Sequence, residues 1–339
     1  MPSSSAQRNI PLCFTGKTAL QVMRAALVAG HVLVPSTRHL APGTAPRQGE
    51  ALAAMERVKA EIPGLHSDLP AQLLVGTHVR CRPTARYAAQ TCAYELPAGS
   101  FLRVVPGVYV ATPALCLVRA AGAGAASDAA LLELGYELCA TYASARTESG
   151  TFYNTPALAT VSELHRYATR CVDVKGARKV ERLVGYVADG SASPRETKLA
   201  LLLALPHRMG GYGLGVPQMN YEVTADGNAQ LISGRRSFRC DVCFPGAKVD
   251  IEYQSREVHG NETSRISDSR RENALKAMGW TVINITNDEL ASMAATDVIA
   301  KTIAGKVGKR MRVRVADYRE RQLCLRAELG LPIDAWALH

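Results

Sequence analysis

The stretch FRCDVCFPGAKVDIEYQ, residues 238–254, decides the fold of the C-terminal part of this chain. Apolar and polar side chains alternate on both sides of 245–248, and a period of two residues is typical of β-strands. If 245–248 form a four-residue turn, Val242 faces Ile251, and apolar side chains meet along both strands. A shift by one residue would pair them with charged side chains, so burial itself selects this register. The sequence therefore predicts an antiparallel hairpin.

The predicted register sets two carboxylates side by side. Asp241 lies opposite Glu252, with Cβ atoms about 4.5–5.5 Å apart. Carboxylates this close repel each other unless one holds a proton or a cation lies between them. Carboxylate oxygens are the ligands that Mg²⁺ prefers. We therefore expect a cation site here. The alternative is a solvated strand face on which Arg239 is the counterion.

Cysteine usage and the absence of long apolar runs favour a cytoplasmic protein without a membrane partner. The nine cysteines are scattered, which suits a reducing compartment. Cys240 and Cys243 form the only close pair, and we expect their thiols on opposite faces of a strand, without a shared metal or redox role. No apolar run approaches the roughly 18–20 residues that a membrane-spanning helix needs. The N-terminus lacks the layout of a secretory signal.

The net charge of +10 is unevenly distributed. Residues 1–125 carry 12 Lys and Arg against 5 Asp and Glu, and residues 301–339 carry 9 against 4. Residues 126–300 carry 19 against 21. Basic flanks are expected of a nucleic-acid-binding protein, because contacts of lysine and arginine with phosphates release counterions. Solvated helix faces are the alternative explanation of the same charges.

Length and pattern divide the chain into four parts. At 339 residues it exceeds the usual size of one domain. We expect a smaller N-terminal α+β domain over 1–125, with a recognition or regulatory role, and a helical connector over 126–190. A second α/β domain is expected over 191–308, followed by a basic helical tail over 309–339.

Gly16-Lys17-Thr18 is similar to the end of a phosphate-binding loop. The leading glycine of such a loop would fall at Pro11, and we expect no strand before it. The sequence therefore predicts no nucleotide cofactor.

From residue 193 the expected elements are a helix, three strands, a helix and a strand. Ser193 and Glu196 form a capping box at the first helix. Ser269 and Glu272 are expected to cap the second helix, and TVINIT at 281–286 is a buried strand. A meander of three strands that receives one crossover strand gives an αβββαβ sandwich with a mixed sheet.

Five separated segments resemble the PD-(D/E)XK nuclease superfamily, and within it the branch related to the very short patch repair (Vsr-like) endonucleases. The segments are SPRETKL, FRCDVCFP, VDIEYQSREVH, DSRRENALKAMGW and VINIT, in the order and approximate spacing of that branch. The resemblance covers about 190–295 and implies a restriction-endonuclease-like fold. It also implies hydrolysis of DNA phosphodiester bonds with Mg²⁺ or Mn²⁺, in genome defence or repair.

The resemblance assigns roles to particular residues. It implies that Asp241 and Glu252 ligate the metal and that Glu196 lies near the ion or its water. His259 matches a further polar position of the site. Gln254 stands where the superfamily pattern usually has lysine. An amide can orient water but can neither accept a proton as a base nor supply positive charge.

Three arginines near these motifs are the candidate contacts to DNA: Arg239, Arg256 and Arg271. Arg271 and Asp268 match further motif positions, where polar groups contact the phosphate or support the site. The structural alternatives are an exposed helix residue for Arg271 and a helix N-terminal charge for Asp268. The resemblance leaves open whether the protein acts as a homodimer.

The segment 97–120 resembles the second half of AbiEi-type antitoxins. This resemblance implies a regulatory or substrate-recognising module ahead of the nuclease-like part. It also supports an alternative function, in which the chain is an antitoxin-like regulator that binds nucleic acid without cleaving it. Gln254 favours that alternative, whereas the two carboxylates favour an enzyme.

Overall fold

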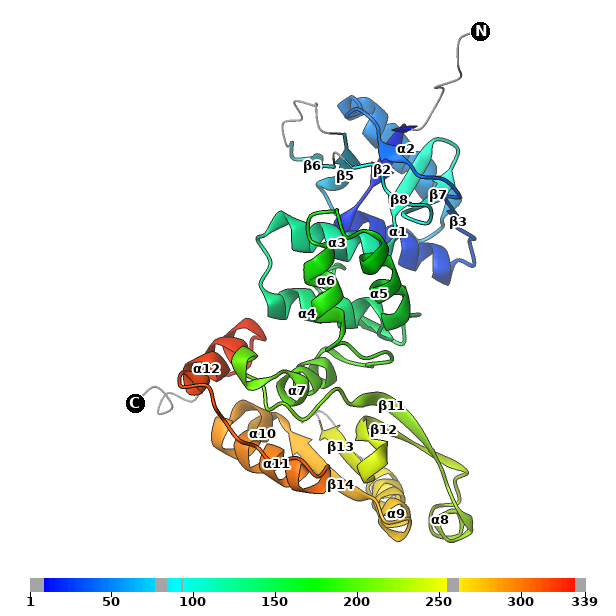
Figure 1. Ribbon diagram of the computed structural model, residues 1–339. Coiled ribbons are helices and arrows are strands. Elements are labelled where there is room, and N and C mark those ends of the chain that lie inside the picture. The colour runs from blue at the N-terminus through cyan, green and yellow to red at the C-terminus, as the bar shows by residue number, and fades with distance from the viewer. Residues whose placement is uncertain (1–8, 77–83, 93, 255–261, 333–339) are drawn as a thin grey trace. The chain divides into compact units, whose positions relative to one another are not determined.

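The computed structural model describes residues 9–76, 84–92, 94–254 and 262–332. The chain folds into two units (Figure 1). The first unit is formed by 1–127 and 137–185, and the second by 128–136 and 186–339. The segment 137–185, expected within a connector, therefore groups with the first unit. The segment 309–339, expected as a tail, groups with the second. Among the described residues, none of the helices has the length and apolar character needed to span a bilayer.

The largest sheet of the first unit is mixed and has the strand order β3-β7-β8-β2-β5-β6. Its strands are β2 (Leu12–Phe14), β3 (Val34–Pro35), β5 (Ala71–Val75), β6 (Tyr87–Thr91), β7 (Phe101–Val105) and β8 (Val108–Ala111). The helices are α1 (Gly16–Val28), α2 (Gln48–Glu61), α3 (Pro113–Ala123), α5 (Val161–Arg170) and α6 (Ala177–Val184). Two further strand pairs are β1 (Asn9–Ile10) with β4 (Ala41–Pro42), and β9 (Tyr142–Ala143) with β10 (Phe152–Tyr153). Helix α4 (Asp128–Leu138) carries residues of both units.

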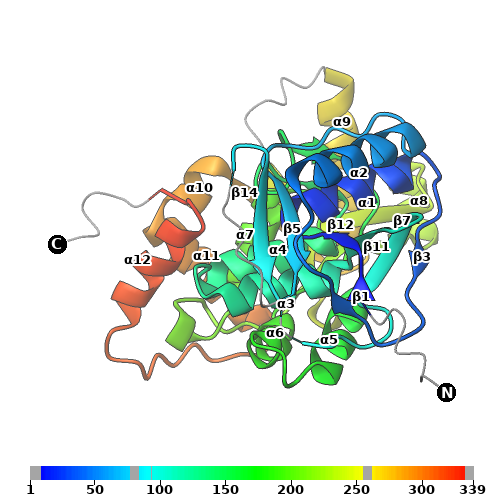
Figure 2. The ribbon, with the colours of Figure 1, turned by 90° about the horizontal axis from the view of Figure 1, so that it is seen from above.

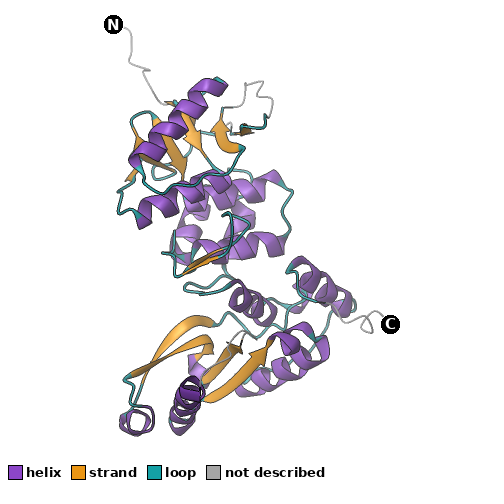
Figure 3. Cartoon of the chain, turned by 180° about the vertical axis from the view of Figure 1, so that it is seen from behind, coloured by secondary structure: helices purple, strands orange, loops and turns teal. Residues whose placement is uncertain are grey.

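The second unit holds a four-stranded mixed sheet in the order β11-β12-β13-β14 (Figure 3). The first three strands are antiparallel neighbours, and β14 joins β13 in parallel. In chain order the elements are α7 (Pro194–Ala204), the 3-10 turn η1 (His207–Met209), β11 (Gln218–Thr224), α8 (Gly227–Ser233), β12 (Ser237–Phe244), the 3-10 turn η2 (Pro245–Ala247), β13 (Val249–Gln254), α9 (Glu262–Ala277), β14 (Thr281–Thr286), α10 (Asn287–Ala291), α11 (Met293–Lys306) and α12 (Tyr318–Glu328). The predicted α/β fold is confirmed, with α8 as an element that the sequence pattern did not predict.

The predicted register of the hairpin is confirmed. Val242 pairs with Ile251, and Phe244 pairs with Val249. Val242, Val249 and Ile251 are fully buried, and Phe244 is half-buried. Lys248 closes the turn with a φ of 50°, in the left-handed region. Burial of the apolar side chains on both strands is what fixes this register.

Helix α9 begins at Glu262, so the predicted cap at Ser269 is wrong. The segment 262–268 holds neither proline nor glycine, and nothing in it interrupts a helix. The helix ends at Ala277, and Gly279 follows it with a φ of +78°, in the left-handed region that ends helices. Half of the predicted capping box of α7 is confirmed, since the Ser193 side chain accepts a hydrogen bond from the N–H of Glu196. The Glu196 carboxylate accepts from the N–H of Ala192 rather than from that of Ser193.

Helix α9 packs on the sheet through Ala274 and Leu275. Both are fully buried in one apolar cluster with Val223 of β11, Phe238 of β12 and Trp280. Burial of this apolar surface stabilises the contact between helix and sheet. The contact also fixes the preceding turn of α9 against β12, which matters for the site described below.

Helix α12 is docked onto the second unit rather than extending as a tail. Figure 2 shows α12 beside α10. Arg326 is fully buried, and its guanidinium donates hydrogen bonds to the carbonyl oxygens of Leu290 at 2.5 Å and Ala291 at 2.7 Å. Gln322 donates to the hydroxyl of Tyr212 at 2.9 Å. A buried guanidinium is costly unless acceptors surround it. These bonds therefore hold α12 in one position beside α10.

Gly210 allows η1 to approach α12, which gives a test of this docking. Its φ is +85°, and a Cβ there would lie 2.2 Å from the carbonyl oxygen of Arg321. Gly308 has a φ of +69° with nothing within 4 Å of the Cβ position. We expect Gly308→Ala to lower the free energy of unfolding by about 1–2 kcal/mol, the cost of a left-handed backbone. Gly210→Ala should cost clearly more, because the clash adds to that cost. Urea unfolding measures both, and equal losses would contradict the docking.

Candidate metal centre

The backbone pairing of strands β12 and β13 ends next to the carboxylates. Beyond the pair of Val242 and Ile251, hydrogen bonds from backbone N–H groups to carboxylate side chains link the two strands. The N–H of Asp241 donates to Glu252 Oε1 at 3.4 Å, and the N–H of Tyr253 donates to Asp241 Oδ2 at 3.2 Å. Asp241 and Glu252 are thus brought together at the point where the two strands separate.

Glu196 joins this cluster from the N-terminal turn of α7. Its carboxylate accepts hydrogen bonds from the N–H of Ala192 at 3.0 Å and from the hydroxyl of Ser193 at 2.9 Å. It also accepts from Asn220 Nδ2 at 2.8 Å. Glu196 is buried, and the charge of Asp241 acts on it. The same residue therefore caps the helix and belongs to the carboxylate cluster.

Asn220 is a member of the site that the sequence analysis missed. It links Glu196 to Arg239, because its Oδ1 accepts a hydrogen bond from Arg239 Nε at 2.6 Å. Its φ is +50°, and the pairing of β11 with β12 skips the step between Asn220 and Asp241. An asparagine inside an otherwise strand-like segment was the available signal, since asparagine is depleted in strands and tolerates the left-handed region.

Asp250 is the most deeply buried carboxylate of the cluster, with 0% exposure. It lies beside Glu252 and Cys240. Its Oδ2 accepts a hydrogen bond from Arg271 Nη2 at 3.4 Å. Its Oδ1 is buried and has no hydrogen-bond partner among the described residues. A buried carboxylate oxygen without a donor is costly, so this atom points to a missing cation or proton.

Arg271 of α9 supplies positive charge inside the cluster. Its Nη2 lies 2.5 Å from Glu252 Oε1 and 3.4 Å from Asp250 Oδ2. The same nitrogen donates to the carbonyl oxygen of Arg239 at 2.7 Å. The guanidinium is thus directed inward, toward the carboxylates. Its expected contact with DNA stays a prediction.

Burial and mutual repulsion raise the pKa values of these acids. Burial first, and then the charge of Glu252, raises the pKa of Asp241 to about 6. Burial raises the pKa of Asp250 to about 7. Burial, followed by the charge of Asp250, raises the pKa of Glu252 to about 8. The pKa of Glu196 is raised by burial and by Asp241. At neutral pH the cluster therefore binds protons unless a cation replaces them.

The donor atoms of Cys240, Asp250 and Glu252 lie within 4.8 Å of one another, a grouping that could hold a metal ion. The expectation that Cys240 and Cys243 point to opposite faces is wrong, because both side chains are buried in the same apolar cluster as Ala274 and Leu275 of α9. The interruption of the ladder beside Asp241 breaks the strict alternation of β12. Carboxylate oxygens suit hard cations, whereas a thiol suits softer ones. The carboxylates and the unpartnered Asp250 Oδ1 fit a divalent cation.

The remaining predicted residues fall into two groups. Arg256 and His259 lie outside the described residues. Gln254, at the end of β13, and Asp268, on α9, are exposed. Arg239 is also exposed and stands two positions before Asp241 on β12.

The Gly16-Lys17-Thr18 segment does follow a strand, so the expectation that no strand precedes it is wrong, whereas Pro11 still stands where a phosphate-binding loop has its leading glycine. Side chains of the first unit, rather than open space for a phosphate, lie against this segment. Gln72 Oε1 accepts from the N–H of Lys17 at 2.9 Å, and it lies 1.9 Å from where a Cβ of Gly16 would be. Lys17 Nζ pairs with Asp68 at 2.5 Å. The lysine is therefore directed to a carboxylate of the first unit.

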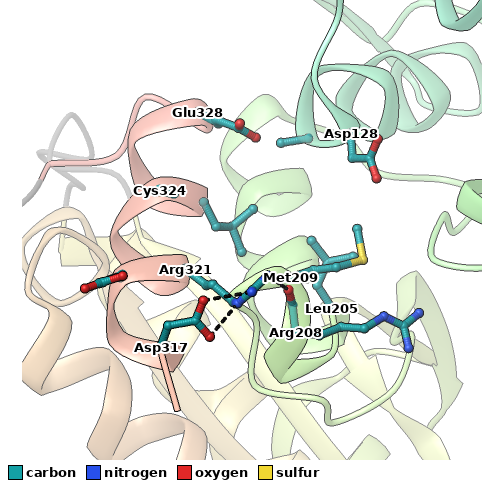
Figure 4. Close-up of a pocket in the computed structure, with 11 residues that line it drawn as sticks. Asp128, Leu205, Arg208, Met209, Asp317, Arg321, Cys324 and Glu328 are labelled. Carbon is teal, nitrogen blue, oxygen red and sulfur yellow. Dashed lines mark hydrogen bonds and ion pairs between the residues drawn. The ribbon is translucent and has the colours of Figure 1, made fainter. Parts of the chain in front are cut away.

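A cavity of about 500 Å³ lies elsewhere in the second unit, along η1 and α12 (Figure 4). Asp317 and Arg321 form an ion pair at 2.8 Å on its wall, and Arg321 also donates to the carbonyl oxygen of Arg208 at 3.0 Å. The carboxylates of the cluster do not line this cavity. The cavity is thus separate from the candidate metal centre.

Comparisons with known proteins leave the family open. No family profile and no solved structure matches the chain. The chain is similar to uncharacterized proteins of two Mycobacterium tuberculosis strains, CDC 1551 / Oshkosh and ATCC 25618 / H37Rv, each 27% identical over 103 residues. The match covers 30% of this chain and 34% of each relative. The chain thus spans about a third of the length of the curated relatives it matches.

The raised pKa values make the stability of the metal-free protein depend on pH. The folded state holds protons on Asp241, Asp250 and Glu252 that the unfolded state has lost, because their folded pKa values lie between about 6 and about 8. The contribution of these protons to the free energy of unfolding is complete at a pH below the ordinary carboxyl pKa. It is lost as the pH rises through the pKa values of the folded state. In EDTA the free energy of unfolding should fall between about pH 4 and pH 8. The slope is up to about 1.4 kcal/mol per pH unit for each such carboxyl. Urea titrations at a series of pH values measure it.

Asp250→Asn isolates one of these carboxyls, because an amide of the same shape does not titrate. We expect a shallower pH dependence in this variant. Glu320→Gln, at an exposed position of α12, serves as the control and should keep the wild-type slope. A wild-type slope in Asp250→Asn would show that Asp250 is already ionised in the folded protein.

Proposed function

We propose that the second unit is a metal-dependent endonuclease domain of the PD-(D/E)XK superfamily that hydrolyses DNA phosphodiester bonds. The observation that carries this proposal is the carboxylate cluster, in which the buried Glu196 and Asp250 lie with the half-buried Asp241 and Glu252, and the Arg271 guanidinium contacts Asp250 and Glu252. An excess of buried negative charge with an unpartnered oxygen suits a divalent cation. The order of elements from α7 to β14 agrees with the order that the sequence resemblance implies.

The residues have distinct tasks in this proposal. Asp241 and Glu252 would hold Mg²⁺ or Mn²⁺, and Asp250 would add negative charge behind them. Bound there, the ion would polarise a phosphoryl oxygen and activate water. Glu196 is fixed by three hydrogen bonds and can orient a water beside the cluster. Arg271 offsets part of the charge of Asp250 and Glu252, and this lowers their pKa values against the opposing effect of burial.

The partners and the setting follow from the same resemblance. DNA is the proposed substrate, and the exposed Arg239 beside Asp241 is placed to meet a phosphate. The proposal includes no nucleotide cofactor. The setting that we propose, genome defence or repair in the cytoplasm, comes from the resemblance and from the scattered cysteines.

Cleavage of plasmid and single-stranded DNA by the purified chain in Mg²⁺ or Mn²⁺ tests this function. We expect Asp241→Asn and Glu252→Gln each to lower the cleavage rate by about 10²-fold or more, because each removes a charged ligand from the reacting centre. Glu320→Gln is the matched control and should cleave at the wild-type rate. Cleavage that persists unchanged in both variants of the cluster would refute the assignment.

Gln254 offers a second, opposite test. It is exposed at the end of β13, where the superfamily pattern has lysine. We expect Gln254→Lys to raise the cleavage rate at least about tenfold, since an ammonium group adds positive charge near the reacting phosphate. A single-turnover assay at saturating metal measures the change. No gain, or a loss, would mean that position 254 does not face the substrate.

The alternative proposal is a regulator that binds nucleic acid without cleaving it. The amide of Gln254 favours it, because the position lacks both a base and a positive charge. This alternative predicts salt-dependent binding of DNA without cleavage in any divalent metal.

A further inference from the structure

A surface next to the candidate metal centre has properties that the proposed cleavage site does not use. Four arginines, Arg235, Arg236, Arg239 and Arg270, are exposed along the start of β12 and along α9. We call these four residues the arginine row. Helix α8 packs against α9 beside them (Figure 1).

The arginine row is held by neutral partners. Arg235 Nη2 donates to the hydroxyl of Ser267 at 2.9 Å, and Arg239 Nε donates to Asn220 Oδ1 at 2.6 Å. Among the described residues, no carboxylate forms an ion pair with any of the four. Glu222 faces Arg239 across the pairing of β11 with β12, and Asp268 lies on α9. Two carboxylates leave four arginines with a net positive charge.

The row continues into the carboxylate cluster. Arg239 stands two residues before Asp241 on β12, and its carbonyl oxygen accepts a hydrogen bond from Arg271 at 2.7 Å. At about 3.3 Å per strand residue, the part of β12 from Ser237 to Asp241 is about 13 Å long, and Arg235 and Arg236 precede it in the segment after α8. One strand of a duplex carries a phosphate about every 3.4 Å of helix axis, so this part alone matches about four nucleotides.

An apolar tip lies at the far end of the row. Leu231 of α8 is 87% exposed, and Ile232 and Ile266 are exposed beside the interface of α8 with α9. The helix that carries Leu231 is firmly placed, because Ala229 is fully buried in the core and Asp226 accepts from the Ala229 N–H at 2.8 Å. The exposure of Leu231 is therefore a property of a fixed helix. Apolar side chains presented among arginines suit the bases of a nucleic acid.

We propose that the arginine row and the Leu231 tip form a nucleic-acid docking surface that feeds the backbone into the centre at Asp241. The arginines contact phosphates, and Leu231 contacts a base. This inference rests on the proposed nuclease function and adds the side chains that hold the substrate away from the reacting phosphate. Charge complementarity argues for a polyanion, and the apolar tip argues for one that carries bases.

Binding in EDTA tests the surface without cleavage. Fluorescence anisotropy with a labelled 20-mer DNA, single-stranded and as a duplex, is measured for the whole chain between 50 and 200 mM salt, roughly the range in which phosphate contacts change affinity strongly. We expect Arg235→Gln and Arg236→Gln each to reduce the slope of log affinity against log salt by about 1 on at least one form. Leu231→Ser should weaken binding about threefold or more and leave the slope unchanged, because it removes no charge.

Lys301→Gln is the matched control, since Lys301 is an exposed cation on α11, away from α8 (Figure 1). It should bind as the wild type does. If the wild type binds and cleaves DNA while the three test variants bind both forms equally well, the docking surface is wrong and the proposed function stands. If the wild type binds neither form at 50 mM salt and cleaves nothing, both proposals fail. Sedimentation of Leu231→Ser tests a further outcome. If this variant is a monomer where the wild type is a dimer, and its affinity for DNA is unchanged, the tip serves self-association and this inference is overturned.

Discussion

The contact of the Arg271 guanidinium with the buried carboxylates is the interaction on which the candidate centre depends. One nitrogen reaches Glu252, Asp250 and the carbonyl oxygen of Arg239, and so ties α9 to both β12 and β13. Without a positive charge, acids held this close would take up protons or separate. The apolar contact of Ala274 and Leu275 with the sheet fixes α9 at that distance. The apolar packing of α9 on the sheet therefore also places the positive charge of Arg271 beside the carboxylates.

Sequence alone predicted the part of this arrangement that burial controls. The pairing of Val242 with Ile251 follows from the need to keep apolar side chains together, and the capping role of Glu196 follows from the local chemistry of a helix start. The position of Asn220 did not follow. Its left-handed backbone interrupts the ladder beside Asp241, and an alternation rule carries no information about such a break. The contact between Cys240 and the acids was missed for the same reason.

Tertiary contacts decided what local patterns could not. The basic, polar composition near the C-terminus predicted a tail. Arg326 is nevertheless fully buried, and its guanidinium donates hydrogen bonds to carbonyl oxygens of α10. The start of α9 was misplaced because Ser269 matches a cap motif, although no residue before it stops a helix. A cap motif is a local signal, whereas the length of a helix depends on what it packs against. Long-range partners of this kind are outside the reach of a single sequence.

The distribution of charge also separates the two proposed functions. Gln254 cannot accept a proton as a base, and the Arg271 guanidinium stays protonated. Glu196 is buried and its carboxylate is held by three hydrogen bonds, although burial and the charge of Asp241 raise its pKa. Asp250 has a free oxygen but no exposure to solvent. Among the described residues, the centre thus offers charge and fixed geometry but no solvent-accessible side-chain base other than the proposed metal ligands. In the proposed nuclease, bulk water or the substrate phosphate must take the proton. The same arrangement is therefore compatible with both proposals, the nuclease and the regulator that binds nucleic acid without cleaving it.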